Sequence, residues 1–135
     1  GTSFTVTVTV NPEPVIANQT PTAICSDGAV GVSFSSSTSV AAATYNVTGL
    51  NLNGLTVSAG GAAVANGLSA SALSDDAFTN TTSSAVNVVY TVVPVATTTG
   101  CLGDAFTVTV TVNPEPVVVA QTATVCSDEV TGVTL

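Results

Sequence analysis

The amino-acid sequence predicts an all-β fold, a sandwich of short antiparallel strands, and three observations support this fold class. Valine and threonine, whose branched Cβ atoms favour strands, are the two commonest residue types in the chain of 135 residues. Several short stretches alternate apolar and polar residues, as half-buried strands do. No stretch shows helical periodicity or an N-terminal capping box, so helices are not expected.

The strand patterns can be followed in chain order, with glycines and a pair of aspartates between them. The first pattern alternates only loosely, whereas in the last one Phe106 and every second residue after it share one apolar face. A total of about seven such strands in roughly 100 residues is typical of an immunoglobulin-like sandwich; a β-solenoid or a barrel is the alternative. The expected strands include Ala29–Ser36, Ala43–Leu52, Leu55–Ala59, Ala77–Asn80, Val86–Val95 and Phe106–Val112.

A long internal repeat is the strongest pattern in the sequence. The twelve residues FTVTVTVNPEPV occur at Phe4–Val15 and again, identically, at Phe106–Val117, an offset of 102 residues. The match continues in the CSD triplets at residues 25–27 and 126–128, with an offset of 101. A period of about 102 residues is too long for a solenoid and fits one complete sandwich per repeat in a tandem array.

The repeat sets the expected domain boundaries. Residues 1–14 are expected to be the last strand and linker of a preceding repeat, 15–116 one complete repeat, and 117–135 the first strands of the following repeat. The chain would then be a piece of a longer protein, which agrees with the lack of an initiator methionine and of a signal peptide.

The junction between repeats is predicted to be a short, stiff spacer. Asn113, Pro114, Glu115 and Pro116 follow the last strand directly, and the same four residues stand at positions 11–14. Proline fixes φ and restricts the residue before it, so the segment is expected to be extended. An ordinary loop is the alternative, and the recurrence of the same residues at both junctions favours the spacer.

The charge composition excludes several classes of function. The chain has no lysine, arginine or histidine against eight acidic residues, which gives a net charge of -8. Nucleic acid and a polybasic membrane contact are therefore excluded as partners. General-base chemistry near neutral pH and most transition-metal sites lack their usual residue, so no enzyme is expected. No apolar run approaches the ~18 residues of a membrane helix, so no membrane insertion is expected either.

Three cysteines are available for pairing. Cys25 opens the complete repeat and Cys101 lies just before its last strand, so we predict an intradomain disulfide between them. Closing a loop of that length contributes about 4–5 kcal/mol in the chain-entropy model, and a disulfide fits an exported, oxidising location. Two buried free thiols are the alternative. Cys126 is the counterpart of Cys25, and it is expected to stay unpaired or to await a cysteine in the following repeat.

Asp75 and Asp76 form the only acidic pair away from the repeat junctions. Oxygen ligands alone would suit calcium, which makes the two aspartates weak calcium candidates. The spacing of an EF-hand or of a nonapeptide calcium repeat is missing, so turn-forming aspartates that serve a loop are preferred and no cofactor is expected. A glycosidase-like carboxylate pair is disfavoured, because the few aromatic residues fall mostly in strand patterns.

Three stretches of the sequence carry a family resemblance: IANQTPTAICSD from residue 16, DDAFTNTTSSAVNVVYTVVP from residue 75, and TTTGCLGDAFTVTVTVNPEP from residue 97. They resemble the PKD-like, immunoglobulin-like repeats of Bacteroidota, and the resemblance covers Val15–Pro116. The resemblance implies tandem repeats in very large cell-surface and gliding-motility adhesins, which are typically exported by the type IX secretion route. It implies no catalytic residues.

On this basis we expect an extracellular, cell-surface protein. The complete repeat would be a structural stalk or spacer of a long adhesin or surface filament, with no catalysis of its own. Its partners would be neighbouring repeats and like chains in a filament, while other parts of the parent protein grip surface glycans or other cells. The alternative is a carbohydrate- or partner-binding module, calcium-dependent or not, which would need an exposed aromatic cluster or an acidic pocket.

Overall fold

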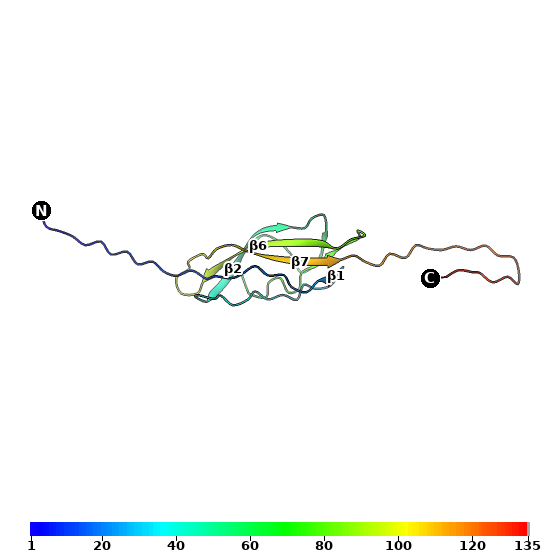
Figure 1. The fold of residues 1–135 in the computed structure, drawn as a ribbon, viewed down its shortest axis with the longest axis horizontal. Coiled ribbons are helices and arrows are strands. Elements are labelled where there is room, and N and C mark those ends of the chain that lie inside the picture. Colours follow the sequence, from blue (N-terminus) through cyan, green and yellow to red (C-terminus); the bar gives the residue numbers. More distant parts are fainter. Residues whose placement is uncertain (135) are drawn as a thin grey trace.

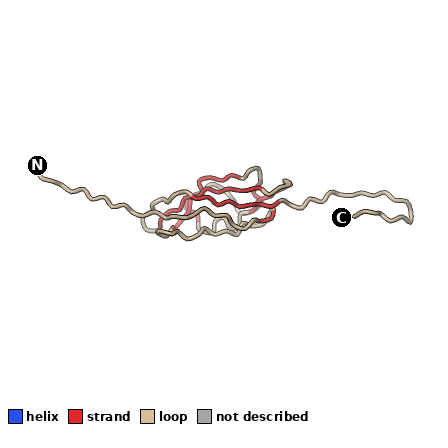
Figure 2. Tube along the Cα trace, viewed as in Figure 1, coloured by secondary structure: helices blue, strands red, loops and turns tan. Residues whose placement is uncertain are grey.

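Two β-sheets pack against each other in the computed structural model, which describes residues 1–134 (Figure 1). The larger sheet has five strands in the order β1-β7-β6-β2-β4, and the smaller sheet pairs β3 with β5. These residues form no helix, and hence none that could cross a membrane (Figure 2). The strands are β1 Ile24–Cys25, β2 Ala42–Asn51, β3 Thr56–Ala59, β4 Ala65–Leu68, β5 Ala77–Thr79, β6 Val86–Ala96 and β7 Phe106–Asn113.

β6 and β7 each bury one face, which follows from strict alternation with threonine in β7, whereas β6 has valines on both faces. Every second residue is buried from Val88 in β6 and from Phe106 in β7. The two strands pair antiparallel from Val86 opposite Val112 to Val92 opposite Phe106, so both apolar faces point to the same side of the sheet. The strands expected at the end of the repeat are thereby confirmed.

Aromatic side chains fill the core between the two sheets. Phe34 packs edge-to-face on Phe106 with ring centroids 5.7 Å apart, and its centroid lies 4.5 Å from that of Tyr45. Phe78 of β5 lies 6.3 Å from Tyr90 of β6, which joins the small sheet to the large one. All these rings are at most 6% exposed, so burial of apolar surface is the main force that holds the sandwich together.

One expected strand is wrong, because Ala29–Ser36 forms no strand in the structure. Gly31 has a φ of 63°, which interrupts an extended backbone. The segment lies instead against residues 70–76, where its N–H groups at positions 30, 31 and 34 donate to carbonyl oxygens at 2.8–2.9 Å. Val30 and Phe34 still enter the core, so the apolar positions of the pattern are correct although its backbone geometry is not.

The first strand departs from the expected antiparallel arrangement, because β1 runs parallel to β7. Cys25 lies opposite Asn113, and Gln19 bridges Val108 further back along the same edge. The chain therefore runs along the sandwich in the same direction before β1 and in β7. It arrives at one end and leaves at the opposite end, which we call the N-terminal end and the C-terminal end (Figure 1).

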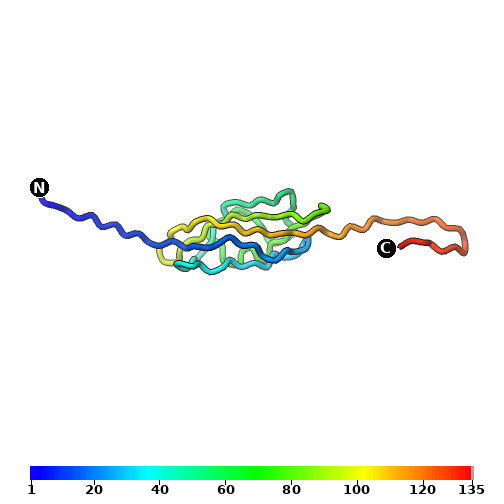
Figure 3. The backbone as a smooth tube through the Cα atoms, in the orientation of Figure 1, coloured from blue at the N-terminus to red at the C-terminus, as the bar shows by residue number. Residues whose placement is uncertain are grey.

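An extended segment leaves each end of the sandwich (Figure 3). Residues 1–13 and 117–134 contain no strand, and their side chains are exposed. The contrast is sharpest in the repeated heptapeptide FTVTVTV, since Phe4 is 87% exposed and Phe106 is 2% exposed. Burial of the second copy is therefore imposed by its neighbours in the sheet. The tandem array and its boundaries stay a prediction.

Candidate functional site

The linker before the complete repeat is held at the N-terminal end of the sandwich. Pro14 is fully buried, and its carbonyl oxygen lies so close to Gly103 that a Cβ atom at that position would collide with it. The N–H of Gly103 donates to the carbonyl oxygen of Pro94 at 2.9 Å, which fixes the segment around Gly103 to the end of β6. The Ser39 hydroxyl donates a hydrogen bond to the carbonyl oxygen of Glu13. The linker thus contacts the domain that follows it.

The linker after β7 is held at the C-terminal end by a second set of hydrogen bonds. The N–H of Glu115 donates to the carbonyl oxygen of Asn80 at 3.1 Å, and its carboxylate accepts the Ser26 hydroxyl at 3.1 Å. The Ser26 hydroxyl oxygen also accepts the N–H of Asn80 at 2.9 Å. Asn80 is fully buried and donates its side-chain amide to the carbonyl oxygen of Val112 at 2.8 Å. Glu115 is therefore fixed to the domain that precedes it.

Corresponding residues of the two linker copies differ in burial in a complementary way. Pro14 is buried, whereas its counterpart Pro116 is exposed. Glu115 is half-buried, whereas its counterpart Glu13 is exposed. The second proline of this segment therefore contacts the domain that follows, as in the first copy. The glutamate contacts the domain that precedes, as in the second copy.

The cysteines Cys25 and Cys101 lie at opposite ends of the sandwich, and both are free thiols. Cys25 is exposed opposite Asn113 at the C-terminal end, whereas the carbonyl oxygen of Cys101 accepts the N–H of Ala96 at the N-terminal end, at 2.8 Å. The two cysteines therefore lie near opposite ends of β6, which is about 33 Å long at a rise of 3.3 Å per residue. A disulfide needs Cα atoms within about 7 Å of each other, so the expected bond within one domain is wrong.

Cys126 is an exposed free thiol in the C-terminal segment. The turn around it repeats the turn around Cys25: the N–H of Glu129 donates to the Cys126 carbonyl oxygen at 3.2 Å, and that of Gly28 to Cys25 at 2.9 Å. The third residue of each CSD triplet has a positive φ, 60° and 69°. The CSD triplet therefore forms the same turn in both copies. The disulfide partner of Cys126 stays a prediction.

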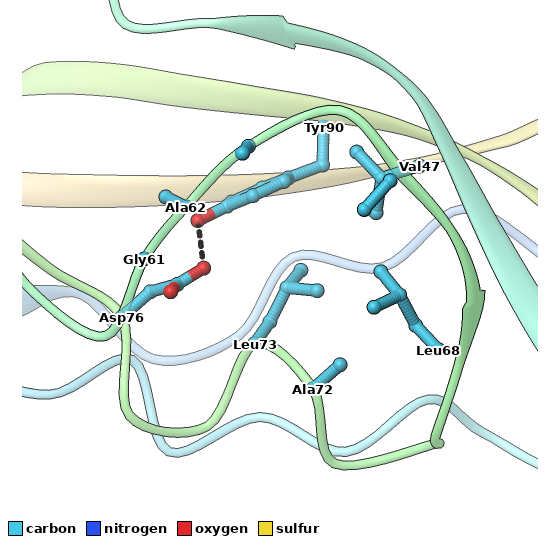
Figure 4. Close-up of a pocket in the computed structure, with 10 residues that line it drawn as sticks. Val47, Gly61, Ala62, Leu68, Ala72, Leu73, Asp76 and Tyr90 are labelled. Atoms are coloured by element: carbon cyan, nitrogen blue, oxygen red, sulfur yellow. Dashed lines mark hydrogen bonds between the residues drawn. The ribbon is translucent and has the colours of Figure 1, made fainter.

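The two weak calcium candidates have different surroundings. Asp75 is exposed, as expected of a turn residue, whereas Asp76 is 3% exposed. Oδ2 of Asp76 accepts the Tyr90 hydroxyl at 2.6 Å, and both residues line a cavity of about 60 Å³ (Figure 4). The backbone packs so closely here that a Cβ on Gly60 would lie 2.7 Å from the Asp76 nitrogen. Asp76 is a core residue, and the expectation that it solvates a loop is wrong.

The electrostatics of this carboxylate follow from its burial. Burial raises the pKa of Asp76, and the charge of Asp75 adds to the effect, whereas hydrogen bonds from Tyr90 and from the Gly61 backbone oppose it. Burial and the adjacent carboxylate also raise the pKa of Tyr90, so its phenol stays a donor. No group of three or more His, Cys, Asp or Glu side chains within residues 1–134 is arranged to hold a metal ion.

A hollow of about 330 Å³ opens at the N-terminal end, beside the contacts of the first linker. Serine and alanine residues line it together with Phe34 and Tyr45, whose rings are at most 6% exposed. Sugar rings usually stack on an exposed aromatic face. In the described part of the chain, the only exposed aromatic ring is that of Phe4 in the N-terminal segment, so the sandwich offers no such platform.

Comparison with known proteins agrees with this architecture. No curated protein and no solved structure matches the chain. The family described as PKD-like domain matches residues 22–116, which begin just before β1 and end with the second linker. The match covers more than half of the sequence and includes all the strands. The chain belongs to the PKD-like domain family.

Proposed function

We propose that the domain is a structural repeat, a stalk or spacer in a long extracellular adhesin or surface filament, with no catalysis of its own. One observation carries this proposal: the two linker copies are docked at opposite ends of the sandwich (Figure 1). A domain that is entered at one end and left at the other lengthens a chain when it is repeated. PKD-like domains are commonly extracellular, which agrees with this role.

The resemblance to Bacteroidota repeats extends the proposal to large adhesins of the gliding type, which reach the cell surface by type IX secretion. Neighbouring repeats of the same chain are the partners that the two contact surfaces fit. Like chains would associate in a filament, and other parts of the parent protein would bind glycans or other cells.

The burial of the residues after each linker indicates how short the junction would be. Ile16 is 7% exposed, whereas its counterpart Val118 is 76% exposed. A following repeat that folds like this one would bury Val118 in its own core, which contributes roughly 1.5–3 kcal/mol for a side chain of this kind. Little more than Pro114–Pro116 would then remain between two consecutive domains.

Small-angle X-ray scattering of a two-repeat chain tests the spacer role. Here the 135-residue chain is extended by a second copy of residues 35–116, which completes the following repeat. Glycine in place of Pro114 and Pro116 is expected to shorten the mean separation of the two domains, because two fixed φ angles are released at the junction.

The matched control replaces Pro12 and Pro14 by glycine in the same two-repeat chain. These prolines hold the same positions before the first domain, so the control removes the same rings. It loosens the exposed N-terminal segment and the contact of the buried Pro14 with the first domain, both of which lie outside the junction. The separation of the two domains should therefore stay unchanged. Equal separations in all three chains would leave the junction as an ordinary loop and refute the spacer role.

A further inference from the structure

We propose that a disulfide crosses each junction between repeats, from Cys25 of one repeat to the counterpart of Cys101 in the following repeat. This inference rests on the proposed tandem arrangement and assigns a covalent partner to each thiol. Each repeat would contribute one thiol at each of its ends, and no bond would form within a domain.

Cys25 lies beside the point at which the chain leaves the domain. It is opposite Asn113 in the pairing of β1 with β7, and the N–H of Ser26 donates to the Asn113 carbonyl oxygen at 3.0 Å. Ser26 also holds the carboxylate of Glu115 in the linker. Because Cys25 is exposed, it is accessible to a partner that arrives with the next domain.

Cys101 occupies the matching place at the opposite end of the domain. It stands two residues before Gly103, which packs against the carbonyl oxygen of Pro14 in the preceding linker. The hydrogen bond from the Ala96 N–H to the Cys101 carbonyl oxygen fixes the turn that carries this thiol. Cys101 is half-exposed, so it too is accessible at the end of the sandwich.

The repeated linker brings these two places together. Pro116 is the counterpart of Pro14, so a following repeat would pack its own copy of Gly103 against Pro116. Asn113 and Pro116 are at most about 11 Å apart, because each residue of an extended chain spans no more than ~3.6 Å. Cys25 and the next copy of Cys101 therefore flank the same short linker. The two cysteines of a single domain are separated by about 33 Å, the length of β6.

The bond forms by exchange with a disulfide oxidant, either oxidised glutathione or a disulfide oxidoreductase. One cysteine thiolate attacks a sulfur of the oxidant and releases a thiolate, and the second cysteine then attacks the mixed disulfide and releases the other. The protein loses two thiol protons and two electrons, and the oxidant is reduced to two thiols. An extracellular location provides such oxidising conditions.

These bonds would shorten the covalent path along the array. From Cys101 the chain reaches Cys126, the next copy of Cys25, within 25 residues. Each of these two cysteines would be bonded across a junction. A covalent path along the array can therefore run through one such segment, cross a disulfide, and continue through the next such segment. The strands β2–β6 of every repeat lie outside this path. Unfolding of those strands would then add little to the length of the array.

Oxidation of the two-repeat chain tests the pairing. This chain contains Cys25, Cys101, Cys126 and a second copy of Cys101. After equilibration with oxidised and reduced glutathione, alkylation followed by intact-mass spectrometry counts the free thiols. We expect two alkylated cysteines and two that are joined. Serine at Cys25, or at the second copy of Cys101, should leave every remaining thiol free.

Serine at the first Cys101 or at Cys126 is the matched control and should leave the bond intact. The proposal would be overturned if serine at the first Cys101 or at Cys126 abolished the disulfide. Four free thiols in the unsubstituted two-repeat chain would also overturn it. Scattering from the reduced chain separates this result from the spacer role. An unbonded chain with a stiff junction rejects the disulfide alone, whereas an unbonded chain with a flexible junction rejects both.

Discussion

Alanine at Phe106 is expected to lower the free energy of unfolding by about 3–5 kcal/mol, the usual cost of deleting a buried aromatic ring. Phe106 is 2% exposed and packs edge-to-face on Phe34, so the core around it can collapse only in part. Alanine at Phe4, in the identical heptapeptide, should change the free energy of unfolding by less than about 0.5 kcal/mol, as surface substitutions do. Urea denaturation measures both values.

The comparison isolates the effect of tertiary burial, because Phe4 and Phe106 have the same neighbours in sequence on their C-terminal side. A chain with alanine at Phe106 that keeps its full stability would contradict the assignment of β7.

Phenylalanine at Tyr90 is expected to cost about 2 kcal/mol of stability at pH 7, the scale of a buried hydrogen bond to a charged group. The substitution deletes the hydroxyl that donates to Oδ2 of Asp76 at 2.6 Å and leaves that carboxylate with one donor fewer. Because the lost hydrogen bond favours the charged form, the pKa of Asp76 should rise further. Denaturant titration over a range of pH values measures the effect.

The sign of the pH dependence follows from the raised pKa of Asp76. Between 3.8, the ordinary value for aspartate, and the higher pKa in the folded state, the folded protein binds more protons than the unfolded chain. The Asp76 contribution to stability is therefore present at lower pH and is lost as the pH rises through this window. Phenylalanine at Tyr90 should widen the window, so its cost should be smaller in acid than at neutral pH.

Two aspartate variants control this prediction. Asparagine at Asp76 should abolish the change of stability with pH in this window. Asparagine at the adjacent, exposed Asp75 should leave most of that change in place. A cost of the Tyr90 substitution that stays constant from acid to neutral pH would contradict a hydrogen bond to a charged Asp76.

The pattern of strand-forming residues was sufficient to predict β2, β6 and β7, together with the buried face of β6 and β7. It did not predict β4, whose residues Ala65–Leu68 include asparagine and glycine and have low strand propensity. This strand forms because β2 offers it an edge, with Tyr45 opposite Leu68. Such a contact between distant segments leaves no pattern in the local sequence.

The errors at the cysteines and at Asp76 have the same origin. Position in the sequence suggested that Cys25 and Cys101 were close, because they flank the first and last strands of the repeat. The parallel pairing of β1 with β7 places them at opposite ends instead. Asp76 follows a serine and another aspartate, which is typical of a turn, and only the fold brings Tyr90 to it. The prolines of the linker restrict the backbone locally, and the role of this segment as a stiff spacer stays a prediction.

The parallel pairing of β1 with β7 also decides how the domain responds to force. Tension on the two linkers draws the segment before β1 toward the N-terminal end and β7 toward the C-terminal end. Gln19 is hydrogen-bonded to Thr107 and Thr109 at 2.8 and 2.9 Å, and Ser26 to Asn113 at 3.0 Å, across this direction. These bonds are loaded in shear, so they must yield together, whereas an antiparallel pair pulled from one end would peel bond by bond.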